Sequence, residues 1–267
     1  MLICSFLVIA LVACVVYVRM AGFVIWKAAL LFALCFAALN VLYILALGFG
    51  ALFVDTSKPL SKQSAFCRAS SVGLSVLINS YCLVRTHVTG AEKLPTDRGF
   101  LLVCNHRSMF DPLVVLDKLR RYNIAFLSKP ENMRIPVAGR VAYGAGFLPV
   151  DRENDRKALV TIKTAAEYLK SGVCSMAVYP EGTRSKTGEL LPFHAGSFKI
   201  AQKANAPLVI AMVRNTEKVA KSILKGGTDV YLDILEVVSP ERVRAMSTLD
   251  LSEYSRSLIA ARQKAAC

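Results

Sequence analysis

The sequence predicts an α/β domain that follows an N-terminal anchor of membrane-embedded helices. Hydrophobic residues make up 54% of the 267 positions and are concentrated at the front of the chain, which is too apolar for an ordinary soluble protein. From Gly90 onward, short apolar runs alternate with stretches of helical periodicity. That alternation indicates a sheet covered by helices on both faces, with functional residues at the strand ends.

The front of the chain, residues 1–57, is predicted to be a membrane anchor of two hydrophobic helices or a re-entrant hairpin. Leu2 to Val18 is an uninterrupted apolar run, and Ala28 to Val54 is a longer one broken only by Asn40. At about 1.5 Å per residue these helices would be about 25 and 40 Å long, against a bilayer core of about 30 Å. No basic segment precedes the first run and Arg19 begins a poor cleavage site, which disfavours a signal peptide. The sequence leaves two spans and a hairpin open.

Basic residues follow the second apolar run, and the whole chain is basic. Lys58, Lys62 and Arg68 lie just after that run, so the positive-inside rule places the rest of the chain in the cytoplasm. Lysine and arginine total 33 against 19 acidic residues, a net charge of +14. No nucleic-acid-binding motif accompanies this charge, and anionic lipid headgroups are the simpler partner beside an apolar anchor. We therefore expect an integral membrane protein that contacts membrane lipids and no nucleic acid.

The remainder divides into a connecting segment and a folded domain. Residues 58–89 mix apolar, serine and basic positions and are predicted to form an interfacial or connecting helix, and residues 90–267 are predicted to form the domain. Its predicted strands are Phe100–Cys104, Ile124–Ser128, Gly146–Val150, Cys174–Tyr179, Leu208–Val213 and Val230–Val237. Its predicted helices are Pro112–Tyr122, Asp155–Leu169, Gly196–Ala204 and about Leu249 to Lys264.

Several chemistries lack support in the sequence. The eight cysteines are scattered without a CxxC pair, and the three histidines stand far apart without a surrounding carboxylate cluster. Neither a disulfide framework nor a metal site is therefore predicted. A G-x-S-x-G motif, which marks the nucleophile of many serine hydrolases, is also absent.

A histidine and an aspartate lie five residues apart where the first predicted strand of the domain ends. The segment reads NHRSMFD, with His106 and Asp111 at its two key positions and Pro112 opening the next helix. Residues five apart do not share a helix face, but on a strand-to-helix turn Asp111 can fold back and bond one ring nitrogen. That bond would free the other nitrogen to accept a proton from a hydroxyl. The alternative is a surface histidine and a helix-capping aspartate that never meet, and the spacing alone favours it.

Three further segments at the ends or starts of apolar runs change that balance. They are Gly146 to Arg152 (GFLPVDR), Tyr179 to Ser185 (YPEGTRS) and Ala206 to Val213 (APLVIAMV). With NHxxxxD, their order and spacing resemble the 1-acylglycerol-3-phosphate acyltransferase (lysophosphatidic acid acyltransferase) family of glycerolipid acyltransferases, over roughly residues 90–213. The resemblance implies a mixed sheet flanked by helices. One departure is visible, because the last block of the family usually carries a second proline where this chain has Ala211.

The EGTRS block, from Glu181 to Ser185, carries side chains that suit a phosphate group. Arg184 offers a planar fork of donors, Gly182 permits close backbone approach, and Thr183 adds a hydroxyl. The alternative is a charged turn with an internal Glu–Arg pair. The resemblance favours phosphate binding, since in the family the glutamate and arginine of this block are associated with the glycerol phosphate. Here they are Glu181 and Arg184.

Two cations near other strand ends are further candidates for phosphate ligands. Arg152 either binds phosphate or pairs with Asp151, and Lys129 is a candidate for a headgroup or CoA phosphate. The two remaining histidines, His87 and His194, lack a comparable context, so we expect surface or packing roles for them.

The resemblance also implies an activity. It predicts transfer of a fatty acyl chain from an acyl thioester to the sn-2 hydroxyl of 1-acyl-glycerol 3-phosphate (lysophosphatidic acid), which gives phosphatidic acid. His106 would be the base, Asp111 would orient it, and no cofactor would be needed beyond acyl-CoA or acyl carrier protein as the co-substrate. The alternatives are glycerol 3-phosphate or another lysolipid as acceptor, or a non-catalytic protein that binds anionic lipid. Acyl-chain length, the identity of the donor and the oligomeric state stay open.

Overall fold

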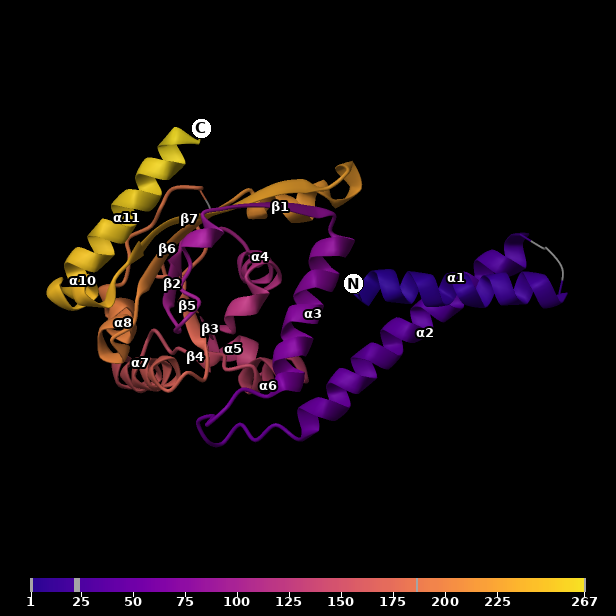
Figure 1. Ribbon diagram of the computed structural model, residues 1–267, viewed down its shortest axis with the longest axis horizontal. Coiled ribbons are helices and arrows are strands. Elements are labelled where there is room, and N and C mark those ends of the chain that lie inside the picture. The colour runs from indigo at the N-terminus through magenta and orange to yellow at the C-terminus, as the bar shows by residue number, and fades with distance from the viewer. Residues whose placement is uncertain (1, 22–24, 186, 267) are drawn as a thin grey trace. The chain divides into compact units, whose positions relative to one another are not determined.

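The computed structural model describes residues 2–21, 25–185 and 187–266. The chain divides into two compact units, Met1–Phe53 and Val54–Cys267. Figure 1 shows the helices and strands of both units.

The first unit is a pair of apolar helices, α1 (Leu2–Ala21) and α2 (Ile25–Leu52), that pack against each other. Large apolar side chains such as Leu45 and Phe49 remain exposed on α2, at 62% and 66% of their area. A helix that leaves such side chains uncovered matches the apolar interior of a bilayer better than water. The apolar N-terminal region predicted from the sequence is therefore present as helix.

Of the residues described, one helical stretch, Trp26–Leu52, is long and apolar enough to cross a membrane, and Ser5–Met20 is a shorter apolar helix. The polar interruption at Asn40 is accommodated inside the helix, because its side-chain amide donates to the carbonyl of Phe36 at 2.8 Å. This finding supports an anchor. The choice between two spans and a hairpin stays open.

The second unit is built on a seven-stranded mixed sheet with the order β1-β7-β6-β2-β5-β3-β4. All neighbours are parallel except β6 and β7, which are antiparallel. The predicted α/β fold with a mixed sheet is confirmed. The strands are β1 (Val84–Thr89), β2 (Leu101–Cys104), β3 (Ile124–Ser128), β4 (Leu148–Pro149), β5 (Ser175–Val178), β6 (Leu208–Arg214) and β7 (Thr228–Val238).

Helices cover both faces of this sheet and create two apolar cores (Figure 1). One core joins α7, α8, α10 and α11 to the sheet, and the other joins α4 and α9 to the opposite face. Central strands such as β2 are buried on both faces, which explains their continuous apolar sequence. The helices of this unit are α3 (Ala65–Tyr81), α4 (Asp111–Lys118), α5 (Pro130–Met133), α6 (Ala138–Gly144), α7 (Asp155–Lys170), α8 (Lys199–Ala204), α9 (Val219–Ser222), α10 (Pro240–Ala245) and α11 (Thr248–Ala265).

The parallel strands β2, β5, β3 and β4 lie side by side, so their carboxyl ends meet at one edge of the sheet. His106 follows β2, Lys129 follows β3, Arg152 follows β4 and Glu181 follows β5. The topology therefore collects the predicted site residues from four separate parts of the sequence at the edge where ligands of such sheets bind.

The segment predicted as a connecting helix, residues 58–89, is only partly helical. It contains α3 and then β1, which pairs in parallel with β7 and so belongs to the sheet. The strand was missed because its alternating sequence, VRTHVT, has charged residues on a half-exposed edge. The domain boundary predicted at Gly90 thus falls after the first strand. The compact unit itself begins at Val54.

Candidate active site

The turn after β2 is fixed to the neighbouring strand by Asn105. Its buried side chain donates to the carbonyl of Val213 at 2.9 Å and accepts from the amide of the same residue at 2.8 Å. Asp111 is the first residue of α4, and Phe110 is the cap, so the cap predicted at Asp111 is displaced by one position. The Asp111 side chain points back into the turn, where it receives the amides of Arg107 and Ser108.

His106 and Asp111 are in direct contact. Nδ1 of His106 lies 2.7 Å from Oδ2 of Asp111. Asp111 is fully buried, and its carboxylate also accepts bonds from the amides of Arg107 and Ser108 and from the hydroxyl of Thr216. A carboxylate only accepts hydrogen bonds, so Nδ1 is assigned as the donor of this contact, and in the neutral imidazole Nε2 is then the acceptor. Within the described part of the chain, nothing hydrogen-bonds Nε2, and the histidine side chain is 18% exposed.

The imidazole of His106 is also held from one side by an aromatic ring. Tyr179 stacks on it with ring centroids 4.2 Å apart and an interplanar angle of 11°. Tyr179 also stacks on Phe126, with ring centroids 5.5 Å apart. Burial raises the pKa of the Tyr179 phenol well above its usual range, so this ring remains a neutral packing surface. The sequence placed Tyr179 in the motif but gave no sign of this contact.

Glu181 links two loops through its carboxylate. It is buried, and its two oxygens accept the backbone amides of His106 at 2.6 Å and Leu191 at 2.9 Å. Burial raises the pKa of Glu181 and the two backbone bonds lower it, with burial the larger effect. The internal Glu–Arg pair considered for this block is absent from the described contacts. This geometry does not favour a contact between Glu181 and a phosphate, because both carboxylate oxygens already accept backbone amides.

The EGTRS block continues with Gly182, which is buried, and with Thr183 and Arg184, which form the open part of the site. Gly182 has φ +73°, and a Cβ there would lie 2.9 Å from Nε2 of His194, so the turn requires glycine. Thr183 and Arg184 are exposed. Within the described residues, the Arg184 guanidinium has no ion-pair or hydrogen-bond partner, so it is available for an external anion.

The two other predicted cations differ in their placement. Asp151 pairs with Lys157 at 3.6 Å and not with Arg152. Arg152 lies beside Gly182, in the wall of a cavity that is described below. Desolvation lowers the pKa of the Arg152 guanidinium, although a group with so high an ordinary value stays charged. Lys129 is exposed at the start of α5. It shares the sheet edge but does not line this cavity.

A cavity of about 470 Å³ opens beside Tyr179 and Gly182. One part of its wall is polar, and His194, expected to be a surface or packing residue, belongs to it. The other part is apolar, so the cavity suits a molecule with a charged head and a hydrocarbon chain. The polar part includes Arg152, Asp155, His194, Ser197 and Lys199, and the apolar part includes Leu127, Val150, Leu159, Ile162 and Val178.

Comparison with known proteins gives the class first. Residues 85–214 match the family model described as Acyltransferase, and they contain the His–Asp pair and the EGTRS block. This part of the chain is an acyltransferase domain, which confirms the acyltransferase class predicted from the motifs.

Individual relatives point to one branch of this class. The chain is 36% identical over 143 residues to the chloroplastic 1-acyl-sn-glycerol-3-phosphate acyltransferase BAT2 of Brassica napus, covering 53% of this chain and 41% of that protein. It is 27% identical over 179 residues to the 1-acyl-sn-glycerol-3-phosphate acyltransferase of Borreliella burgdorferi, covering 65% of this chain and 66% of that protein. The chain thus spans less than two thirds of the length of these relatives.

A solved structure supports the fold. The crystal structure of the 1-acyl-sn-glycerophosphate acyltransferase PlsC from Thermotoga maritima matches with a TM-score of 0.60 and 23% sequence identity. The match covers 82% of this chain and 89% of that one. This chain therefore shares the fold of that protein, a mixed sheet with flanking helices.

Proposed function

We propose that this protein is a 1-acylglycerol-3-phosphate O-acyltransferase that forms phosphatidic acid in phospholipid biosynthesis. The observation that carries the proposal is the 2.7 Å contact between His106 and Asp111, which leaves Nε2 of the ring without a partner in the described part of the chain. The names of the relatives supply the acceptor, lysophosphatidic acid.

The proposed reaction needs only the dyad and an activated donor. Nε2 of His106 takes the proton of the acceptor hydroxyl as its oxygen attacks the thioester carbonyl, and Asp111 stabilises the resulting imidazolium. The new ester C–O bond forms, the C–S bond breaks, and the leaving thiolate recovers the proton from His106. A thioester is already activated, so no covalent acyl-enzyme and no cofactor are required.

The proposed phosphate site consists of cations that have no counter-ion among the residues that the structure describes. Arg184 would bind the acceptor phosphate with two parallel bonds, assisted by Arg152 and by the Gly182 and Thr183 positions of the loop. Lys129 is a more distant candidate for a headgroup or CoA phosphate. In this proposal Glu181 positions the loop, and the apolar wall of the cavity faces an acyl chain.

We also propose that the protein is integral to a membrane, with the catalytic unit on the cytoplasmic face. The apolar helix Trp26–Leu52 supports an anchor, and Lys58 and Lys62 follow it closely. Alkaline carbonate washing should leave the full chain in the membrane pellet. Cysteine labelling from outside intact cells should not reach residues after Gly90, and labelling there would contradict the cytoplasmic assignment.

An assay with the purified enzyme tests the activity and identifies the acyl donor. The full-length protein is incubated with labelled acyl-CoA or acyl-carrier-protein thioester and with lysophosphatidic acid, glycerol 3-phosphate or an unphosphorylated monoacylglycerol. We expect phosphatidic acid from lysophosphatidic acid and a much slower reaction without the phosphate. Equal rates on phosphorylated and unphosphorylated acceptors would contradict the proposed substrate.

A further inference from the structure

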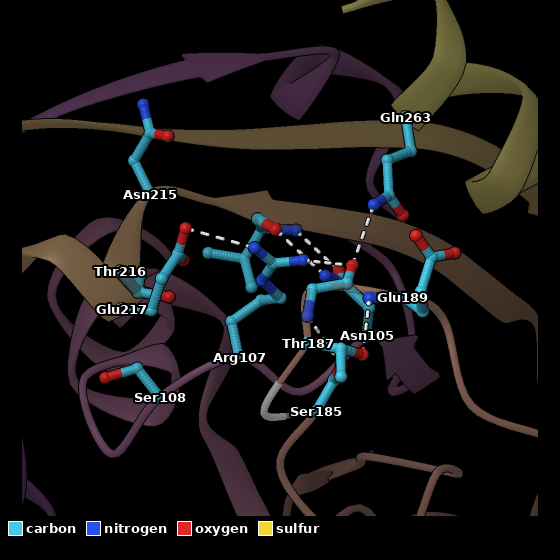
Figure 2. Close-up of polar contacts among 12 residues, drawn as sticks. Asn105, Arg107, Ser108, Ser185, Thr187, Glu189, Asn215, Thr216, Glu217 and Gln263 are labelled. Atoms are coloured by element: carbon cyan, nitrogen blue, oxygen red, sulfur yellow. Dashed lines mark hydrogen bonds and ion pairs between the residues drawn. The ribbon is translucent and has the colours of Figure 1, made fainter. Parts of the chain in front are cut away.

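Arg107 lies between the two catalytic-dyad residues in the sequence, and its side chain contacts two other loops. Figure 2 shows this side chain beside Glu217. Nη1 donates to the carbonyl of Gly188, and Nη2 donates to Oε1 of Glu217 at 3.0 Å. The side chain is only 18% exposed. One guanidinium therefore joins the loop after the EGTRS block to the loop after β6.

Gly188 is held from several directions. Its φ is +91°, which favours glycine, and a Cβ there would lie 3.3 Å from both terminal nitrogens of Arg107, so a side chain would crowd the guanidinium. Its carbonyl accepts a second bond, at 2.9 Å, from the side-chain amide of Gln263 on α11. Its amide donates to Oγ of Ser185 at 3.1 Å, and the amide of Ser185 donates to the carbonyl of His106 at 3.0 Å. The end of the EGTRS loop is thus fixed relative to the dyad.

The second branch of Arg107 leads to the support of the dyad itself. Glu217 follows Thr216, whose hydroxyl donates to the buried carboxylate of Asp111. The contact between Arg107 and Asp111, however, is made by the backbone amide of Arg107. Shortening the Arg107 side chain would therefore leave all the donors to Asp111 in place, and its effects can be separated from those of the dyad.

We propose that Arg107 is a positioning residue that, together with Gln263, holds Gly188 so that Arg184 presents the acceptor phosphate at the right place for His106. This role rests on the proposed function. Arginine suits it because its planar fork spans two acceptors, whereas the single ammonium of lysine satisfies one of them well. Gln263 adds a neutral bond to the same carbonyl, so its contribution is smaller.

Kinetics on the full-length enzyme test the coupling between Arg107 and Arg184. Arg107→Ala should raise the KM for lysophosphatidic acid roughly tenfold and leave the KM for the acyl thioester unchanged. Arg107→Lys and Gln263→Leu should each raise it by less. In an Arg184→Ala background, Arg107→Ala should raise the acceptor KM no further, because the residue that it positions is gone. The same fold-increase in both backgrounds, or a fall in kcat with the acceptor KM intact, would overturn the proposal.

Amide hydrogen exchange tests the same idea without any substrate. Arg107→Ala should speed exchange at the amides of Ser185 and Gly188, while Arg242→Ala serves as the control because Arg242 pairs with Glu236 outside this network. Unchanged exchange at these two amides would overturn the positioning role even if the enzyme acylates lysophosphatidic acid. Faster exchange in a protein that fails to acylate lysophosphatidic acid would instead reject the proposed acceptor and retain the contact.

Discussion

The two halves of the candidate site differ in how far the protein itself satisfies their polar groups. Asp111 is fully buried and accepts four hydrogen bonds, and Glu181 is buried with both oxygens bonded. Arg184 and Thr183 are exposed, and the guanidinium of Arg184 has no partner among the described residues. The groups proposed to transfer the proton are thus already organised by hydrogen bonds within the protein. The groups proposed to bind the phosphate are left free for the substrate to bind.

The largest effect is expected from breaking the organised half at the dyad. His106→Ala should lower kcat by about 10²- to 10⁴-fold, the usual contribution of a general base, and leave the fold intact because this side chain is partly exposed. Asp111→Asn should be similarly impaired, since an amide cannot stabilise the imidazolium. Acyl transfer is measured with labelled acyl-CoA, and His87→Ala, at a distant ion pair with Asp229, is the control. Near-normal turnover in either dyad variant would exclude the proposed mechanism.

Glu181→Gln should disturb the organised half without removing a reacting group. The side-chain oxygen of glutamine can accept a hydrogen bond from only one of the two backbone amides. Its NH₂ group then faces the other backbone amide, and two donors are left opposite each other. We expect the free energy of unfolding to fall by about 1–3 kcal/mol, together with a lower kcat. Thermal unfolding of the variant is compared with that of Glu253→Gln, an exposed residue. If the variant were as stable and active as the wild type, the link between the loops would be unimportant.

Arg184→Lys should test the open half, where the effect is confined to binding. Lysine keeps the charge but cannot form two parallel bonds to a phosphate, so the acceptor KM should rise roughly tenfold with little change in the donor KM. Arg98→Lys, at an exposed surface ion pair, is the control. An acceptor without phosphate should lose almost nothing further in the variant. A fall in kcat with an unchanged acceptor KM would assign Arg184 to the transition state or to loop structure.

The smallest effect is expected for two buried cysteine thiols of the sheet region, Cys104 and Cys174. Burial raises the pKa of Cys174 to about 12 and that of Cys104 well above its usual range, so at pH 8 both are protonated and inaccessible. Alkylation of the native protein at pH 8 should therefore miss both residues, and peptide mapping should find them labelled only after denaturation.

Because the folded-state pKa of Cys174 is raised, its contribution to stability is present below the ordinary thiol value near 9 and is lost as the pH rises towards 12. Rapid native labelling of Cys104 would show that the strand end beside the dyad opens.

Local apolar runs predicted six of the strands but not β1, whose alternating sequence places charge on a half-exposed edge. The spacing of His106 and Asp111 alone did not favour their contact, and the resemblance to the family supplied that prediction. The roles of Glu181 and Arg107 could not be predicted, because their partners lie 75 and 110 positions away in the chain. Nothing in a turn sequence states which distant amide its carboxylate will accept. The stacking of Tyr179 on His106 was missed for the same reason, as it depends on β2 and β5 being neighbours.

The pairing of β1 with β7 has a consequence for how the chain folds. Arg85 on β1 bonds Asp229 on β7 across 144 positions of sequence, so the first described strand to leave the ribosome pairs with the last one. At usual rates of synthesis the delay between the two is on the order of ten seconds, during which β1 has an unpaired edge. Arg85 places a charge and His87 a polar ring on that edge, which opposes pairing with other chains, and both side chains contact Asp229 in the folded sheet. The same two side chains therefore oppose aggregation of the unpaired strand β1 and later contribute to its pairing with β7.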